Sequence, residues 1–263
     1  MGDLKKVLKK INYILTDTEG TLNIGYARIG NMSDTLDKLR AQGKKIVFFT
    51  NDSAYSAATL TERLKLTDII RADDIIYTSV TATVDYIRQN HPGKTCFVAG
   101  APDIAEEFEA AGIPQDDISP EIVVITRDVT VSYVKLVKAV SAINSGAFYI
   151  ATNAETKFHS GEVLPDCGAF AGLIEAVTGR RPQAVIGAPA KFMGENIMQK
   201  LGCNADEILI VGDRLTGVRL GIDCGFYTLI VKTGETDEKI LRESDIEPDF
   251  VLESLNDIAD YIE

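Results

Sequence analysis

Short runs of apolar residues, many of them β-branched, recur along the chain and end in polar residues. In the outer parts of the sequence these runs occupy 13–16, 46–50, 208–211 and 228–231. Uncharged runs of this length predict strands that are buried on both faces, and such strands belong to parallel sheets covered by helices. The pattern therefore favours a layered α/β protein.

Amphipathic stretches separate these strands. The stretch from Ser33 to Gly43 begins with a residue type that caps helices, carries Leu36 and Leu39 three positions apart, and ends in glycine. Similar features predict helices over 56–66 and 190–201. The alternation of strand and helix is that of βαβ units, which build a Rossmann-like parallel sheet.

The middle of the chain repeats the same alternation with its own elements. Apolar runs at 96–99, 122–125, 148–151 and 184–186 are separated by helical stretches at 104–111 and 131–145. These elements are numerous enough to bury a separate core. We therefore predict a core domain formed by 1–82 and 184–263, with an α/β cap domain inserted at 83–183.

Composition narrows the classes of function. The 263 residues carry a formal net charge of −12, and the basic cluster at 4–10 is short, so nucleic acid is not an expected partner. Its apolar positions are typical of a short helix leading into a core strand, although a membrane-surface helix has the same pattern. No apolar run is long enough to span a bilayer. Four widely spaced cysteines indicate neither a zinc site nor a disulfide framework, and we expect a cytoplasmic protein without a membrane partner.

Polar side chains follow three of the predicted core strands, at the point where each strand ends. Asp17 and Glu19 follow the first strand, Thr50 and Asn51 close the second, and Asp213 follows the strand at 208–211. Ligands of an open parallel sheet bind outside the carboxyl ends of its strands. The carboxylates and hydroxyl at this edge are candidate ligands, although each of these residues taken singly is more often a loop former or a helix cap.

The order and spacing of these segments resemble the motifs of the haloacid dehalogenase (HAD) superfamily, in particular the NagD and p-nitrophenylphosphatase branch with a type-IIA cap. The resemblance rests on 15–22, 48–51 and 211–215, and on further segments at 125–128, 148–153, 233–234 and 247–251. It implies a Rossmann-like HAD core with an inserted α/β cap domain. It also implies an Mg²⁺-dependent hydrolase that forms a phospho-aspartate.

The same resemblance implies a role for each matching residue. Asp17 takes the place of the nucleophile and Glu19 that of the general acid and base. Thr50 and the backbone N–H of Asn51 take the place of the phosphate-binding groups. The metal ligands implied are Asp17, the backbone carbonyl of Glu19, and Asp213.

Three positions depart from the family pattern. The usual acid/base aspartate is Glu19, whose extra methylene moves the carboxyl, and a displacement near 1 Å can lower a rate about 100-fold. The usual lysine of the Gly-Lys-Pro motif is Ala188, although Lys191 lies three residues on and is our candidate for binding phosphate instead. A second carboxylate expected near the metal is Val218, with Asp223 the nearest alternative in sequence or, equally, a surface residue.

These departures leave the activity open between two hypotheses. The first is slow hydrolysis of a small phosphorylated metabolite, and the second is a degenerate HAD-fold protein that binds a phosphorylated ligand or a partner without turnover. A nicotinamide dehydrogenase is a poorer alternative, because no Gly-x-Gly-x-x-Gly follows the first strand. The resemblance also makes a homodimer an open alternative.

Overall fold

The computed structural model describes residues 3–159 and 162–262. By its internal contacts the chain forms two compact units. The first comprises Met1–Thr50, Thr61–Tyr77 and Gly194–Glu263, and the second comprises Asn51–Leu60 and Thr78–Met193. These limits differ from the insert predicted at 83–183, because the second unit also takes 51–60 and a longer stretch on each side.

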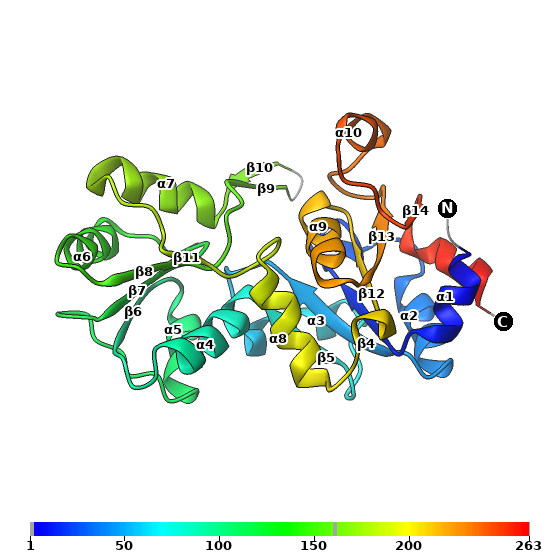
Figure 1. Cartoon of the computed structure of the whole chain (residues 1–263), viewed down its shortest axis with the longest axis horizontal. Helices are drawn as coiled ribbons and strands as arrows, with labels where there is room; N and C mark the ends of the chain where they lie inside the picture. Colours follow the sequence, from blue (N-terminus) through cyan, green and yellow to red (C-terminus); the bar gives the residue numbers. More distant parts are fainter. Residues whose placement is uncertain (1–2, 160–161, 263) are drawn as a thin grey trace. The chain divides into compact units, whose positions relative to one another are not determined.

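The first unit contains a six-stranded sheet with the order β14-β13-β12-β1-β4-β5 (Figure 1). The register of the β1, β12, β4, β13 and β14 pairs is parallel. The strands in chain order are β1 (Tyr13–Thr16), β4 (Lys45–Thr50), β5 (Ile75–Thr78), β12 (Ile208–Gly212), β13 (Tyr227–Val231) and β14 (Phe250–Leu252). The apolar residues of β1, β4, β12 and β13 are mostly buried, as the uncharged runs predicted, whereas the edge strands β5 and β14 are partly exposed.

Helices and short connections surround this sheet. α9 packs on β12 and β13, and α2 packs on β4 and on the closing 3₁₀ turn η2. A two-stranded hairpin, β2 (Asn23–Ile24) with β3 (Ala27–Arg28), follows β1. The other elements are α1 (Leu4–Lys10), α2 (Met32–Ala41), α3 (Ala57–Leu66), α8 (Lys191–Leu201), η1 (Ala205–Glu207), α9 (Leu215–Cys224), α10 (Glu238–Glu243) and η2 (Leu255–Tyr261).

The second unit is built on a four-stranded parallel sheet with the order β11-β8-β7-β6. Helices α6 and α7 lie on one face of this sheet and α4 and α5 on the other (Figure 1). A small antiparallel hairpin joins β9 to β10. The elements are α4 (Ser79–Asn90), β6 (Cys96–Ala99), α5 (Pro102–Ala110), β7 (Ile122–Ile125), α6 (Tyr133–Asn144), β8 (Phe148–Ala151), β9 (Lys157–His159), β10 (Val163–Pro165), α7 (Cys167–Thr178) and β11 (Ala184–Val185).

The predicted elements are present in both units, and the structure corrects some helix ends. Ser56 caps α3 as expected, since its hydroxyl accepts the Thr59 N–H at 3.1 Å. Ser33, in contrast, is not a cap: α2 begins at Met32 with Asn31 at its N-cap position. The Ser33 hydroxyl instead donates to the backbone oxygen of Asp68 at 2.7 Å, a partner 35 residues away that local sequence could not indicate.

The N-terminal basic stretch is a core-packing helix. Leu4, Val7 and Leu8 of α1 are buried, and the helix contacts η2. This agrees with the interpretation as a short helix leading into a core strand. Among the described residues no helix is both long and apolar enough to cross a bilayer.

Candidate active site in the first unit

The first unit brings Asp17, Thr50 and Asp213 to one edge of its sheet. β1 pairs with β12 on one side and with β4 on the other, so the residues at the ends of these three strands are neighbours. Asp17 follows β1, Thr50 closes β4 and Asp213 follows β12. The Thr50 hydroxyl donates a hydrogen bond to the Asp17 carboxylate. The strand ends therefore bring two carboxyl groups and a hydroxyl together.

The Asp17 carboxyl lies in an environment that resists its ionisation. Burial, followed by the negative charge of Asp213, raises its pKa to about 7. The charge of Arg214, the backbone N–H of Thr18 at 2.8 Å and the Thr50 hydroxyl act in the opposite direction. A positive charge bound between the two carboxylates would therefore hold Asp17 ionised at neutral pH.

Asp213 has one satisfied carboxylate oxygen and one unsatisfied oxygen. Its Oδ2 accepts the Glu235 N–H at 2.8 Å, whereas its buried Oδ1 has no hydrogen-bond partner among the described residues. Burial raises the pKa of this carboxyl as well. A buried oxygen without a partner is costly, and a divalent cation that takes oxygen ligands would supply one.

Two glycines allow the backbone to approach Asp213 closely. A Cβ at Gly20 or at Gly234 would overlap the Asp213 carboxylate. Gly20 also has φ +76°, a left-handed conformation that favours glycine. The unsatisfied oxygen and this narrow cradle fit a small cation with few protein ligands. No cluster of three or more His, Cys, Asp or Glu side chains forms in the described part of the chain, so such a cation would need backbone or water oxygens too.

Glu19 is held by the hairpin that follows it. Its two carboxylate oxygens accept the Gly25 N–H at 3.0 and 3.1 Å, and the side-chain amide of Asn23 lies 3.4 Å from Oε2. Asn23 in turn donates to the Gly25 carbonyl at 2.6 Å. The candidate acid/base is therefore positioned by the β2–β3 hairpin, through partners four and six residues away along the chain.

Arg214 is a charged residue at this edge that sequence reasoning missed. Its Nε lies 3.1 Å from Glu235 Oε2, and only 16% of the Arg214 side chain is exposed. Its charge lowers the pKa of both Asp17 and Asp213, although burial outweighs that effect in each case. Its position directly after Asp213 was the signal that could have found it.

Comparison with known proteins places this arrangement in a family. Residues 14–114 match the family described as haloacid dehalogenase-like hydrolase, and residues 185–258 match a second HAD-hydrolase-like family. A dihydroxyacetone phosphatase from Corynebacterium glutamicum (strain R) is 30% identical over 248 residues, which cover 94% of this chain and 90% of the relative. The chain belongs to the haloacid dehalogenase-like hydrolases. Phosphoglycolate phosphatase 2 of Arabidopsis thaliana is also 30% identical, over 100% of this chain and 97% of that protein.

Solved structures show which branch of the HAD family this chain resembles. A 4-nitrophenylphosphatase from Thermotoga maritima superposes with a TM-score of 0.92 at 32% identity, covering 98% of this chain and 99% of the other. NagD from E. coli K-12 gives 0.85 at 26% identity, covering 95% and 98%. The NagD-like HAD fold is thus confirmed, and relatives named as phosphatases support a phosphatase. A nicotinamide dehydrogenase is removed from consideration.

The position of the missing family lysine lies in the second unit and is tied to Asn51. The Ala188 N–H donates to Asn51 Oδ1 at 2.8 Å, and Asn51 Nδ2 donates back to the Ala188 carbonyl at 2.9 Å. Nδ2 also donates to Glu155 at 3.2 Å. The Asn51 side chain is therefore occupied within this unit, which leaves its backbone N–H as the predicted phosphate contact.

The structure also gives the positions of Val218, Asp223 and Lys191, the other residues considered at the departures from the HAD pattern. Val218 is buried within α9, with 2% of its surface exposed. Asp223 pairs with Arg219 at 3.3 Å, one turn away on the same helix, as a surface residue would. Lys191 is the exposed first residue of α8, and its predicted role in binding phosphate stays a prediction.

Proposed function

We propose that this protein is an Mg²⁺-dependent phosphatase that hydrolyses small phosphomonoesters through a phospho-Asp17 intermediate. The observation that carries the proposal is that two buried carboxyl groups act on each other at this edge. The negative charge of Asp213 raises the Asp17 pKa, and Asp213 Oδ1 is buried without a hydrogen-bond partner among the described residues. Bound there, Mg²⁺ would neutralise the carboxylates and the phosphate oxygens. Asp17, Asp213 and the backbone carbonyl of Glu19 are its proposed ligands.

The residues of the chain then account for both half-reactions. An Asp17 carboxylate oxygen attacks phosphorus, the bond to the leaving oxygen breaks, and Glu19 gives that oxygen a proton. Glu19 then takes a proton from water, which attacks phosphorus, releases phosphate and restores Asp17. The Thr50 hydroxyl, which already bonds to Asp17, would hold a phosphate oxygen. The backbone N–H of Asn51 and Lys191 are further proposed phosphate contacts.

We propose that turnover is slow, because Ala188 removes a fixed cation. Loss of one preorganised donor to the transition state typically lowers kcat about 10²- to 10³-fold. Arg214 supports the retention of some activity, since its charge already acts on Asp17. It is held by Glu235, so it would act from a fixed position.

The test is phosphate release from p-nitrophenyl phosphate and a panel of phosphorylated metabolites, with Mg²⁺, for the wild type and Asp17→Asn. We expect turnover in the wild type and a loss of at least about 10³-fold in the variant, because a covalent nucleophile is removed. Equal release by both proteins would contradict the proposal.

A second candidate function is the binding of a phosphorylated ligand without hydrolysis, which Ala188 and Val218 favour. Its signature would be thermal stabilisation by phosphorylated metabolites together with no phosphate release. The net charge of −12 argues against nucleic acid in either case. A cytoplasmic location and a homodimer remain proposals, which cell fractionation and light scattering would test.

A further inference from the structure

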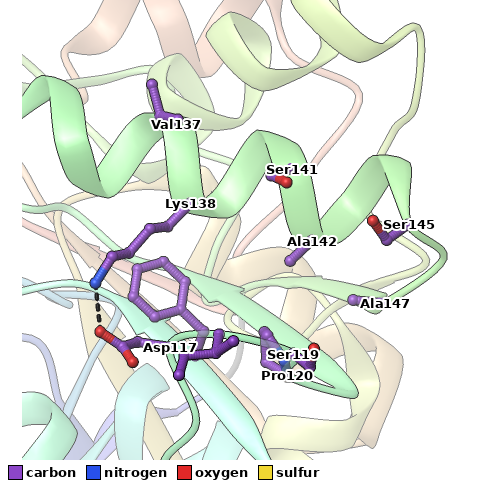
Figure 2. Close-up of a pocket in the computed structure, with 11 residues that line it drawn as sticks. Asp117, Ser119, Pro120, Val137, Lys138, Ser141, Ala142, Ser145 and Ala147 are labelled. Atoms are coloured by element: carbon purple, nitrogen blue, oxygen red, sulfur yellow. Dashed lines mark hydrogen bonds and ion pairs between the residues drawn. The ribbon is translucent and has the colours of Figure 1, made fainter.

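A cavity of about 450 Å³ opens in the second unit, beside the edge strand β6 (Figure 2). Its walls come from β6, from the segment before β7, from α6 and from the turn after α6, all within that unit. The volume falls in the range of small-molecule sites, about 300–1,000 Å³. Nothing in the proposed phosphatase mechanism uses this cavity.

The segment before β7 is shaped by a local hydrogen-bonded turn. The backbone N–H groups of Ile118 and Ser119 both donate to Asp116 Oδ1, at 2.8 and 3.0 Å. These bonds lower the pKa of Asp116, which keeps its carboxylate ionised and the turn closed. The turn fixes the backbone of Asp117, the next residue, at the mouth of the cavity.

Charge is concentrated at one end of the cavity. Figure 2 shows Lys138 of α6 and Asp117 joined by an ion pair at this end, while Ser145 and Ala147 lie at the other. The two side chains are 39% and 59% exposed. An ion pair in water stabilises a protein little, so its opening for a ligand would cost little.

The rest of the lining is neutral. Phe97 and Pro120 contribute apolar surface, together with Val137, Ala142 and Ala147. Hydroxyl groups are contributed by Ser119, Ser141 and Ser145. One cation and one anion at one end, together with a neutral lining that is partly exposed, therefore define the chemistry of the cavity.

We propose that this cavity binds a free α-amino acid with an uncharged side chain. The carboxylate of such a zwitterion pairs with Lys138 and its ammonium group pairs with Asp117, so that both protein charges keep a partner. The side chain lies along Phe97 and Pro120, toward the serines. A ligand with a single charge would leave Lys138 or Asp117 without a partner, and a phosphorylated ligand would be repelled by Asp117. The proposal does not depend on phosphatase activity.

The test is to titrate the full chain with leucine, phenylalanine and glutamine and to measure binding from the amide chemical shifts in NMR spectra. We expect at least one of the three to shift the amide signals of 117–119 and 137–147 with a Kd of about 1 mM or below. Phenethylamine, which lacks the carboxylate, and N-acetylphenylalanine, which lacks the ammonium charge, should bind at least about 10-fold more weakly than phenylalanine.

Two variants decide whether the ion pair is responsible. Lys138→Met and Asp117→Asn should each weaken binding at least about 10-fold. Lys94→Met is the matched control, because Lys94 pairs with Glu121 in the same unit with similar exposure and does not line the cavity. Its Kd should equal that of the wild type. No shift at about 10 mM amino acid, or an unchanged Kd in Lys138→Met, would overturn the proposal.

Discussion

Two groups of carboxylates, one in each unit, differ in their counter-charges. In the first, Asp17 and Asp213 raise each other's cost of ionisation, and Asp213 Oδ1 has no partner in the described structure. In the second, Asp52 pairs with the Arg127 guanidinium at 2.5 Å, and that guanidinium lies 3.9 Å from the centre of the Phe158 ring. In the second group Arg127 is the counter-charge, whereas in the first burial outweighs the charge of Arg214, and we propose that a bound cation completes the site.

This difference distinguishes a candidate metal-binding site from an ion pair with a structural role. A buried ion pair with a built-in partner stabilises the arrangement that holds it, and breaking it leaves an uncompensated charge. Buried carboxylates without a compensating cation lower the stability of the metal-free protein, and they would bind a metal ion favourably. Substitutions of charge in the Asp17–Asp213 group and in the Asp52–Arg127 pair should therefore have opposite effects on stability.

The largest effect should follow from Asp213→Asn. We expect Mg²⁺-dependent phosphate release to fall at least about 10³-fold, while the metal-free protein gains about 1 kcal/mol of stability because a buried charge is removed. Saturating Mg²⁺ at about 100 times its Kd should stabilise the wild type by about 2.7 kcal/mol, and the variant far less. Phosphate assays and denaturant melts with and without Mg²⁺ would check this. Equal Mg²⁺ stabilisation of both proteins would contradict the proposed metal site.

The next largest effect should follow from Arg127→Met in the second unit. Only 8% of the Arg127 side chain and 19% of the Asp52 side chain are exposed, so the variant leaves a largely shielded carboxylate without its guanidinium. We expect a loss of about 3 kcal/mol in the free energy of unfolding. Arg181→Met is the control, since Arg181 pairs with Glu175 but is 81% exposed, and it should cost less than about 1 kcal/mol. Similar losses in the two variants would show that the buried pair has no special role.

The smallest effect concerns Asp166, which caps α7 by accepting the Cys167 N–H at 2.6 Å. Burial raises its pKa to about 6. The folded protein therefore binds more protons than the unfolded chain between about pH 4 and pH 6, and stability falls as pH rises through that window. Above it, the ionised carboxylate costs about 3 kcal/mol.

Asp166→Asn keeps a capping residue without this charge. The variant should equal the wild type near pH 4 and exceed its stability by up to about 3 kcal/mol at pH 8. Asp3→Asn is the matched control, because Asp3 caps α1 in the open and its pKa is lowered by the Lys6 N–H, so its pH effect should have the opposite sign. Urea melts from pH 4 to pH 8 would measure both. A pH-independent difference for Asp166→Asn would contradict the prediction.

The elements of the fold could be predicted from sequence because their signals are local. β1, β4, β12 and β13 of the first unit, and β6, β7, β8 and β11 of the second, lie where uncharged apolar runs predicted strands. Asp17, Thr50 and Asp213 could be found for the same reason. Each follows or closes a strand, and parallel strands deliver their ends to one edge.

The sequence by itself therefore determined the strands, the helices between them and the edge where chemistry is expected. Tertiary structure alone decided which side chains are already engaged: Glu19 with Gly25, Asn51 with Ala188, and Arg214 with Glu235. It also decided that one oxygen of Asp213 is buried without a partner. The reason is physical: hydrophobic periodicity is a property of neighbouring residues, whereas hydrogen-bond partners and burial arise only when distant segments are packed together.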